Sequence, residues 1–151
     1  MSPEPTNAPD PRYFSLDEAN RTLPLVRRIV EDIVAQYREL QPLAARLRDL
    51  PPAHRSGEVG RALTSSAEAK ARAIDELVTE LHELGCLFKG LQDGLVDWYS
   101  FYADRPVFLC WKLGEAEIAW WHQVDAGFAG RQPILPSQRG AFRSERVGGG
   151  R

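Results

Sequence analysis

The chain has 151 residues, of which 43% are hydrophobic and 26% charged, and its formal net charge is −2. These values predict one globular domain with enough apolar residues for a core, and the near-neutral balance gives no overall attraction to nucleic acid. Uninterrupted apolar runs are only a few residues long and the first residues are polar and rich in proline, so we expect no membrane span, no signal peptide and a cytoplasmic location.

A proline-rich leader, residues 1–12, opens the chain and should be disordered, because few of its side chains could pack. Ser15 and Glu18 have the spacing of a capping box, so a short helix should start there. Pro24 suits the first turn of a following helix, where its missing N–H removes no hydrogen bond.

Two longer helices are predicted next. Apolar residues recur at alternating spacings of three and four from Val26 to Leu47, which is typical of an amphipathic helix, and Pro42 should cause a kink or a restart. Residues 50–60 have the composition of a loop, and Gly85 offers a C-terminal cap to a second helix. The apolar seam of this second helix consists of Ala67, Ile74, Leu77, Leu81 and Leu84.

The two helices should form an antiparallel hairpin. Two helices that each carry one narrow apolar stripe do not enclose a core, so the uncovered side must lie on a sheet, on a second copy of the chain, or on both. We expect a homodimer. The alternative is a monomer whose seam is covered by its own sheet.

Residues 86–101 predict a β-hairpin, because Asp93-Gly94 is a strong turn signal between two strand-like runs. With these two residues in the loop, Gly90 faces Asp97 across the hairpin.

Residues 106–133 contain a second predicted hairpin, with Gly114-Glu115 as a type II′ turn between two runs rich in aromatic residues. Its register places Lys112 opposite Glu117. Opposite charges across a ladder contribute about 0.2–1 kcal/mol, which supports this register.

The four strands should form an antiparallel meander packed against the helical hairpin, which is an α+β fold over residues 13–135. Residues 136–151 are polar and rich in arginine and glycine, so we expect a flexible tail. A tail of this kind can bind phosphate non-specifically, but the cluster is weak, and we expect a solvated tail without a nucleic-acid partner. Its arginines are Arg139, Arg143, Arg146 and Arg151.

Three segments carry a resemblance to a known family: YFSLDEANRTLPLVRRIVEDI, LGCLFKGLQDGLVDWYS and VFLCWKLGEAEIAWWHQVDAGFAGRQPI. They resemble a prokaryotic family catalogued as domain of unknown function 2203, over roughly residues 13–135. The resemblance implies a shared fold and a shared surface but no reaction. Where the family is expected to have a Lys-Asp pair this chain has Lys89-Gly90, which implies the loss of a carboxylate beside Asp97 and weakens a metal site carried over from the family.

Cys110, His122, Glu115 and Asp97 are residue types that can ligate zinc or iron. In the predicted register, however, Cys110 and His122 point to opposite faces and Glu115 lies in the turn. We therefore assign no metal site from the sequence and leave the cofactor open. A buried structural cysteine and a hydrogen-bonded histidine are the preferred interpretation, and Cys86 and Cys110 lack the CxxC spacing of a disulfide or zinc framework.

General acid-base chemistry is a second possibility. His122 titrates near neutral pH and Glu115 or Asp97 could tune it, which makes these three the candidate catalytic residues. The sequence has no nucleophile elbow, HExxH motif, phosphate-binding glycine loop or dinucleotide fingerprint. A reactive thiol at Cys110, next to Lys112, is a weaker alternative.

An aromatic surface on the second hairpin is the third possibility. Aromatic walls with cationic groups suit a small aromatic or anionic ligand, through stacking and hydrogen bonding. The alternative is that most of the tryptophans, including Trp98, cover the helices as core. The candidate ligand-binding residues are Trp111, Trp120, Trp121, Lys112 and Arg131.

Two functions therefore remain. The first is a dimeric interaction or small-ligand-binding module that uses the aromatic hairpin surface. The second is a small enzyme, with or without the assistance of a metal, that has His122, Glu115 and Asp97 as working groups. The sequence favours the first.

Overall fold

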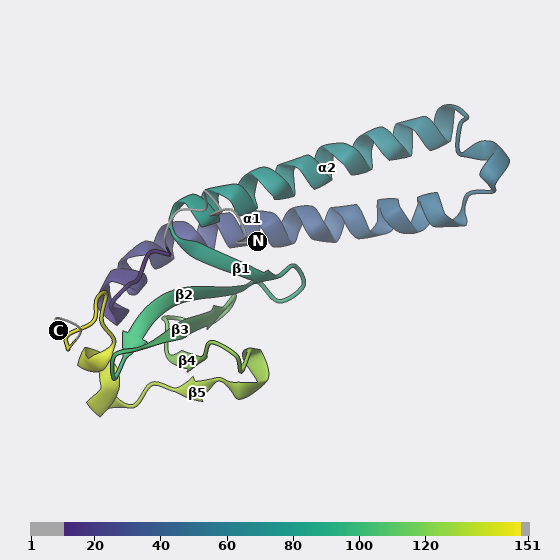
Figure 1. Cartoon of the computed structure of the whole chain (residues 1–151). Helices are drawn as coiled ribbons and strands as arrows, with labels where there is room; N and C mark the ends of the chain where they lie inside the picture. Colours follow the sequence, from purple (N-terminus) through teal and green to yellow (C-terminus); the bar gives the residue numbers. More distant parts are fainter. Residues whose placement is uncertain (1–10, 149–151) are drawn as a thin grey trace, which may run out of the picture.

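The computed structural model describes residues 11–148, and its first half is a pair of long helices. Helix α1 (Leu16–Asp49) and helix α2 (Glu58–Glu83) run antiparallel, with a short 3-10 helix, Pro52–His54, between them (Figure 1). The predicted helical hairpin is confirmed, whereas nearly all of the predicted leader, residues 1–12, lies outside the described residues. Within the described part of the chain, no helix is both long and apolar enough to cross a lipid bilayer.

Helix α1 starts where the capping box predicts. The Ser15 hydroxyl accepts a hydrogen bond from the Glu18 N–H, and the Glu18 carboxylate accepts one from the Ser15 N–H, each at 3.1 Å. The helix then continues through Pro24 and Pro42, so the predicted short helix and the predicted restart are both wrong. Both prolines lie at exposed positions, and packing of the opposite side of the helix offsets the hydrogen bond that each removes.

An antiparallel sheet of five strands follows the helices, with the strands in chain order. The α+β class is confirmed, but the sequence predicts four strands. The fifth strand has two residues, too few for a periodic pattern to reveal it. The strands are β1 (Cys86–Gly90), β2 (Leu95–Tyr102), β3 (Arg105–Lys112), β4 (Trp120–Gln123) and β5 (Gln132–Pro133).

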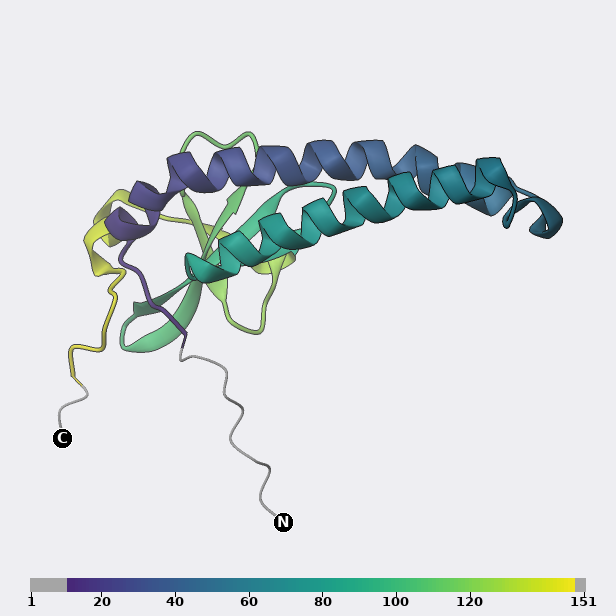
Figure 2. The same ribbon diagram turned by 90° about the horizontal axis from the view of Figure 1, so that it is seen from above.

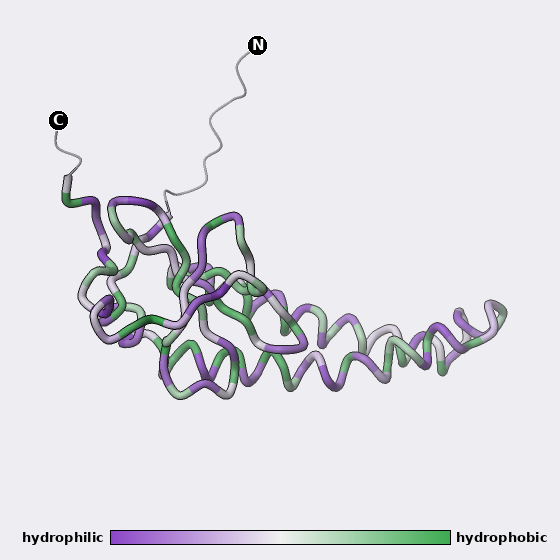
Figure 3. Tube along the Cα trace, turned by 90° about the horizontal axis from the view of Figure 1, so that it is seen from below, coloured by the Kyte–Doolittle hydropathy of each residue, from purple (hydrophilic) through white to green (hydrophobic). Residues whose placement is uncertain are grey.

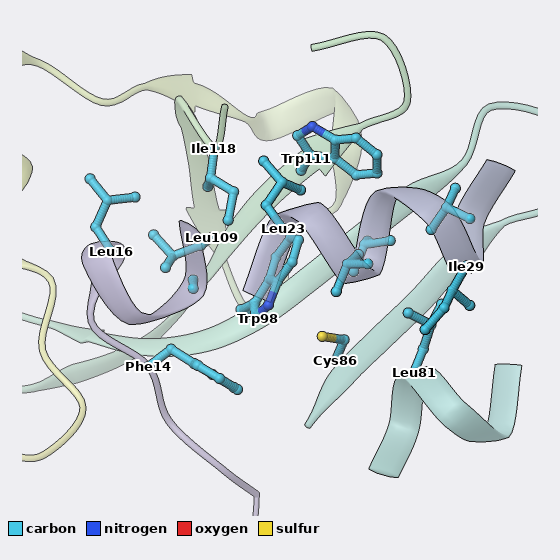
Figure 4. Close-up of a cluster of buried hydrophobic side chains, with 14 of the residues drawn as sticks. Phe14, Leu16, Leu23, Ile29, Leu81, Cys86, Trp98, Leu109, Trp111 and Ile118 are labelled. Atoms are coloured by element: carbon cyan, nitrogen blue, oxygen red, sulfur yellow. The ribbon is translucent and has the colours of Figure 1, made fainter. Parts of the chain in front are cut away.

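One face of the sheet, the inner face, packs against the helices, and the outer face is turned away from them (Figures 1 and 2). Figure 4 shows Trp98 of β2 in the core between sheet and helices, among Leu23 of α1 and Leu109 of β3. Trp98 is fully buried, and its indole N–H donates to the Thr22 hydroxyl at 3.1 Å. Cys86 contributes a buried, free thiol to the same core.

The sheet covers only the first part of the helical hairpin. The buried residues of α1 all lie between Leu16 and Val34, and the hairpin extends beyond the sheet after that point (Figure 2). In this distal part the two helices pack against each other, and hydrophilic residues recur between hydrophobic ones along the trace (Figure 3). Apolar residues there, such as Leu40 and Leu47, remain half-buried.

The first hairpin differs from its predicted register. Asp97 lies opposite Leu87, not opposite Gly90. The connection is a turn over residues 91–94, and the ladder shifts between Phe88 and Gly90. Asp93-Gly94 is therefore a correct turn signal, but the turn is longer than the predicted two-residue loop.

The second hairpin also differs, by one residue. Its connection spans residues 113–119, and Phe108 lies opposite His122. The predicted pairing of Lys112 with Glu117 is wrong, because β4 starts only after Glu117.

Contacts with helix α1 explain the longer connection. Ile118 is fully buried and its N–H donates to the Asn20 side chain at 2.9 Å, so the chain turns into the core before β4 begins. Arg27 donates to the Ala116 carbonyl at 2.9 Å. Since these partners are far apart in the sequence, the turn signal alone could not reveal the loop length.

Residues 136–148 fold onto the sheet, which corrects the predicted flexible tail for this part of the chain. A 3-10 helix covers Pro136–Ala141, and Phe142 after it is 2% exposed. Arg143 exchanges two backbone hydrogen bonds of 2.9 Å with Phe101, next to the part of β2 that β1 does not reach. The segment covers a strand edge and gains an aromatic anchor, which outweighs its polar composition. Arg151 lies outside the described residues.

Candidate metal centre

Three buried polar side chains meet on the outer face of the sheet, one each from β2, β3 and β4. Asp97, Cys110 and His122 are 4%, 1% and 3% exposed. Asp97 lies directly opposite Cys110, and His122 lies opposite Phe108, two residues before Cys110 on the same strand. Opposite residues of antiparallel strands share a face, so the three converge. Their ligand atoms all lie within 4.8 Å of one another, and we call this group the Asp-Cys-His cluster.

The predicted register separates Cys110 and His122 onto opposite faces, and this is wrong. Side chains alternate between faces along a strand, so a shift of one residue moves every side chain of the strand to the other face. In the observed register His122 and Cys110 share the outer face. The objection that the sequence raised to a metal site is thereby removed.

Two hydrogen bonds fix the His122 ring. Nδ1 lies 2.7 Å from the Gln123 carbonyl oxygen, which can only accept, so Nδ1 carries a proton. Nε2 lies 3.2 Å from Asp97 Oδ2. In the neutral ring Nε2 therefore points its lone pair at the cluster, and a backbone carbonyl behind Nδ1 is the usual support of a metal-binding histidine.

Burial dominates the protonation of the other two groups. It raises the pKa of the Asp97 carboxyl above its usual range, although the neighbouring His122 partly opposes this. Burial, followed by the charge of Asp97, raises the pKa of the Cys110 thiol to about 12. Without a metal, burial keeps the thiol protonated at neutral pH, which argues against the reactive thiol weighed for Cys110.

A cavity of about 200 Å³ opens above the cluster. The three polar groups lie on its wall together with apolar side chains from the sheet and from the loop after β4, and Lys89 of β1 adds one cation. The other lining residues are Leu95, Phe108, Val124, Gly127 and Phe128.

Glu115, a candidate catalytic residue, belongs to a different arrangement. Its carboxylate accepts two hydrogen bonds from Arg131 at 2.9 and 2.7 Å and one from the Lys112 N–H at 2.7 Å. The guanidinium of Arg131 also lies over Trp120, 4.5 Å from the ring centroid. Glu115 thus ties the loop after β4 to the end of β3 and does not contact His122, whereas Asp97 does.

The candidate aromatic surface divides between core and surface. Trp111 is fully buried on the inner face and donates to the Glu115 carbonyl at 2.9 Å, and Trp121 is 5% exposed beside Phe142. Trp120, Lys112 and Arg131 remain partly exposed. Of the five predicted ligand-binding residues, only these last three lie where a ligand could reach them in this conformation.

Lys89 is the residue near the cluster that the sequence analysis did not single out as a candidate site residue. It lines the cavity, whereas Gly90 lies opposite Leu95, and the Asp-Cys-His cluster is assembled without a carboxylate at position 90. The predicted register of the first hairpin was wrong by three residues, so it did not show that Lys89 lies near the cluster. A single lysine in a strand also has no sequence pattern that would mark it as part of a site.

Fold and site together define a class: a helical hairpin on the inner face of a five-stranded sheet, with a buried Asp-Cys-His cluster on the outer face. The chain belongs to the family described as "Uncharacterized conserved protein (DUF2203)", whose sequence profile matches residues 12–134. The match includes both helices, all five strands and the three residues of the cluster. Neither the curated proteins nor the solved structures gave a significant match to the chain.

Proposed function

We propose that this protein is a metalloprotein that binds a zinc-type divalent ion through Asp97, Cys110 and His122 and uses its open coordination position in metal-assisted chemistry on a small molecule. The observation that carries the proposal is the orientation of His122. Its Nδ1 is held by a backbone carbonyl, so Nε2 faces a carboxylate and a thiol at the edge of a cavity.

The donor set favours zinc, or cobalt in its place. One imidazole nitrogen, one sulfur and one carboxylate oxygen are all common zinc ligands, and a thiolate disfavours magnesium and calcium. Two ligand atoms bound to a tetrahedral zinc ion with bonds of about 2.0–2.1 Å are separated by about 3.3 Å. The 3.2 Å between His122 Nε2 and Asp97 Oδ2 agrees with this spacing.

Three protein ligands point to a reactive site in preference to a structural one. Structural zinc sites have four protein ligands, whereas catalytic sites have three and leave the fourth position to water or substrate. Within residues 11–148 the cluster contains three candidate ligands, and the cavity lies beside them. A metal ion there would lower the pKa of a bound water or polarise a bound oxygen.

A metal-free hydrogen-bonded cluster is the simplest competing explanation. Burying a carboxylate, a thiol and an imidazole costs free energy, and hydrogen bonds recover only part of it. These groups also lie on the face turned away from the helices and adjoin a cavity, where a purely structural cluster brings little packing.

Recognition through the aromatic hairpin surface is the second candidate function. Phe128 is 46% exposed and lies beside Lys112 and Arg131, at 5.9 and 5.0 Å from its ring centroid. We place this function second because Trp111 and Trp121 are buried.

Metal content tests the proposal directly. The full chain, purified without chelators and loaded with Co²⁺, should bind one ion per chain and show the absorption bands of tetrahedral cobalt with a thiolate ligand. Cys110→Ala should abolish the thiolate band. Cys86→Ala, which removes the buried thiol of the inner core, is the matched control and should retain it. Folded wild-type protein without stoichiometric metal, or equal spectra for the two variants, would overturn the proposal.

A further inference from the structure

We propose that the open coordination position takes a small organic monoanion, a short-chain carboxylate, and that Lys89 supplies the matching positive charge. This inference rests on the proposed metal site and specifies what that site binds. It depends on three features of the cavity: its net charge, the placement of Lys89 and its apolar walls.

The ligands of the metal determine the charge that is left over. With Cys110 as thiolate, Asp97 as carboxylate and His122 neutral, the protein ligands cancel the charge of a divalent ion. Lys89 then leaves the cavity with one net positive charge. A monoanion neutralises that charge, whereas a dianion would leave a negative charge in a confined, partly apolar space.

Lys89 is placed to make this contact. Its ammonium lies 5.2 Å from the ring centroid of Phe108, which lines the cavity and lies opposite His122. No ion pair engages Lys89 within residues 11–148. The ammonium is therefore available to a ligand that bridges it and the metal, and its positive charge also acts on Asp97.

Cavity size and walls define the rest of the ligand. A water molecule takes up about 30 Å³, so a cavity of about 200 Å³ holds the equivalent of roughly six or seven waters. A ligand held wholly within that volume has only a few heavy atoms. Leu95 and Phe108 line the cavity, and Val124 and Phe128, each 46% exposed, add apolar surface from the loop after β4. A short alkyl chain would lie against these residues while the carboxylate reaches the metal.

Titration of the cobalt-loaded full chain tests the inference with three probes. Sodium butyrate should change the visible cobalt bands saturably, with a dissociation constant in the millimolar range that is typical of very small ligands. Butyramide has the same shape without the charge and should leave the bands unchanged. At about pH 8, where inorganic phosphate is mainly a dianion, it should bind more weakly than butyrate because of its second charge.

Lys89→Met should weaken butyrate binding about tenfold, as expected for the loss of one charge-assisted contact, while the cobalt spectrum stays intact. Lys70→Met removes the ammonium of helix α2 that pairs with Glu39 at 2.9 Å, outside the lining of the cavity, and should change butyrate affinity by less than about twofold. The inference would be overturned if the cobalt bands are intact but do not change on addition of butyrate, or change equally with butyramide or more strongly with phosphate. An equal loss of butyrate affinity in the two lysine variants would also overturn it. Absence of the cobalt bands themselves would instead overturn the metal site.

Discussion

His122 Nε2 lies 3.2 Å from Asp97 Oδ2, while Nδ1 of the same ring lies 2.7 Å from the Gln123 carbonyl oxygen. Because that carbonyl holds one ring proton at Nδ1, the contact with Asp97 requires a second proton, on either the ring or the carboxylate, when no metal is bound. In the proposed metal complex, the ion would replace this proton and the thiol proton of Cys110. His122 and Asp97, which need a shared proton in the metal-free protein, would then both be metal ligands.

Substitution of Asp97 should separate metal binding from stability. Asp97→Asn keeps the volume of the side chain and removes a carboxyl whose pKa burial raises, so the free energy of unfolding of the chelator-treated protein should change by less than about 1 kcal/mol or increase. Cobalt binding should be lost, because a neutral amide is a poor zinc ligand. The matched control is Asp125→Asn on the exposed loop after β4, which should bind cobalt normally. Retention of full cobalt affinity by Asp97→Asn would exclude this residue as a ligand.

Metal binding should also stabilise the fold. An ion that binds only the folded state at a concentration of 100 times its dissociation constant adds about 2.7 kcal/mol. For a domain of this length that corresponds to a rise in Tm of roughly 5–10 °C. Thermal unfolding with zinc and then with excess chelator measures the change. Cys110→Ala should show no rise and Cys86→Ala a normal one, and a similar rise in both variants would place the ion elsewhere.

The fold was predictable from the sequence to the extent that local patterns specify it. The capping box at Ser15 and the helical periodicity locate the two helices, and the Asp93-Gly94 signal locates a turn. Loop lengths were not predictable, since the second connection is set by Ile118 entering the core and by its hydrogen bond to Asn20, a residue far away in the chain.

The candidate site depended on those loop lengths. Asp97, Cys110 and His122 all appear among the residues singled out from the sequence, but a one-residue error in register placed Cys110 and His122 on opposite faces. The residue types of the Asp-Cys-His cluster could therefore be predicted from the sequence, but the convergence of their side chains could not. The same error in register explains why the sequence could not show which tryptophans are buried, because the register of a strand decides which of its indoles face the helices.

Glu115 should prove structural. Glu115→Gln replaces the carboxylate that accepts two hydrogen bonds from Arg131 with a neutral amide. Because the Arg131 side chain is largely buried and would lose its charged partner, the substitution should lower the free energy of unfolding by about 1–3 kcal/mol. Cobalt binding should persist. Glu117→Gln, whose carboxylate is exposed and lies 3.5 Å from Arg139, is the matched control and should cost less than about 1 kcal/mol. Chemical denaturation and cobalt absorption measure the two effects. Loss of the cobalt bands in folded Glu115→Gln would instead make this carboxylate part of the site.

The homodimer stays a prediction, and the distal part of the helical hairpin is where a second copy would bind. That part extends beyond the sheet, and Leu40 and Leu47 are only half-buried there. Sedimentation equilibrium should give a dimer mass, and Leu40→Lys should shift the protein to monomer without loss of helical circular dichroism. A monomer mass for the wild-type chain at all concentrations would contradict the dimer.

Stability at alkaline pH should reveal the buried thiol of Cys86. Burial raises its pKa to about 12, so the folded state keeps this thiol protonated where the unfolded state ionises it. The contribution of Cys86 is therefore fully present below about pH 9 and is lost at about 1.4 kcal/mol per pH unit as the pH rises toward the folded pKa. Cys86→Ala should be less stable than wild type at pH 7, because it leaves a small cavity in the core, and the difference should shrink by more than 1 kcal/mol by roughly pH 10. Urea unfolding under reducing conditions, with a chelator to remove any metal at Cys110, measures both variants. A difference between wild type and Cys86→Ala that stays constant with pH would show that the folded protein ionises this thiol as readily as the unfolded chain does.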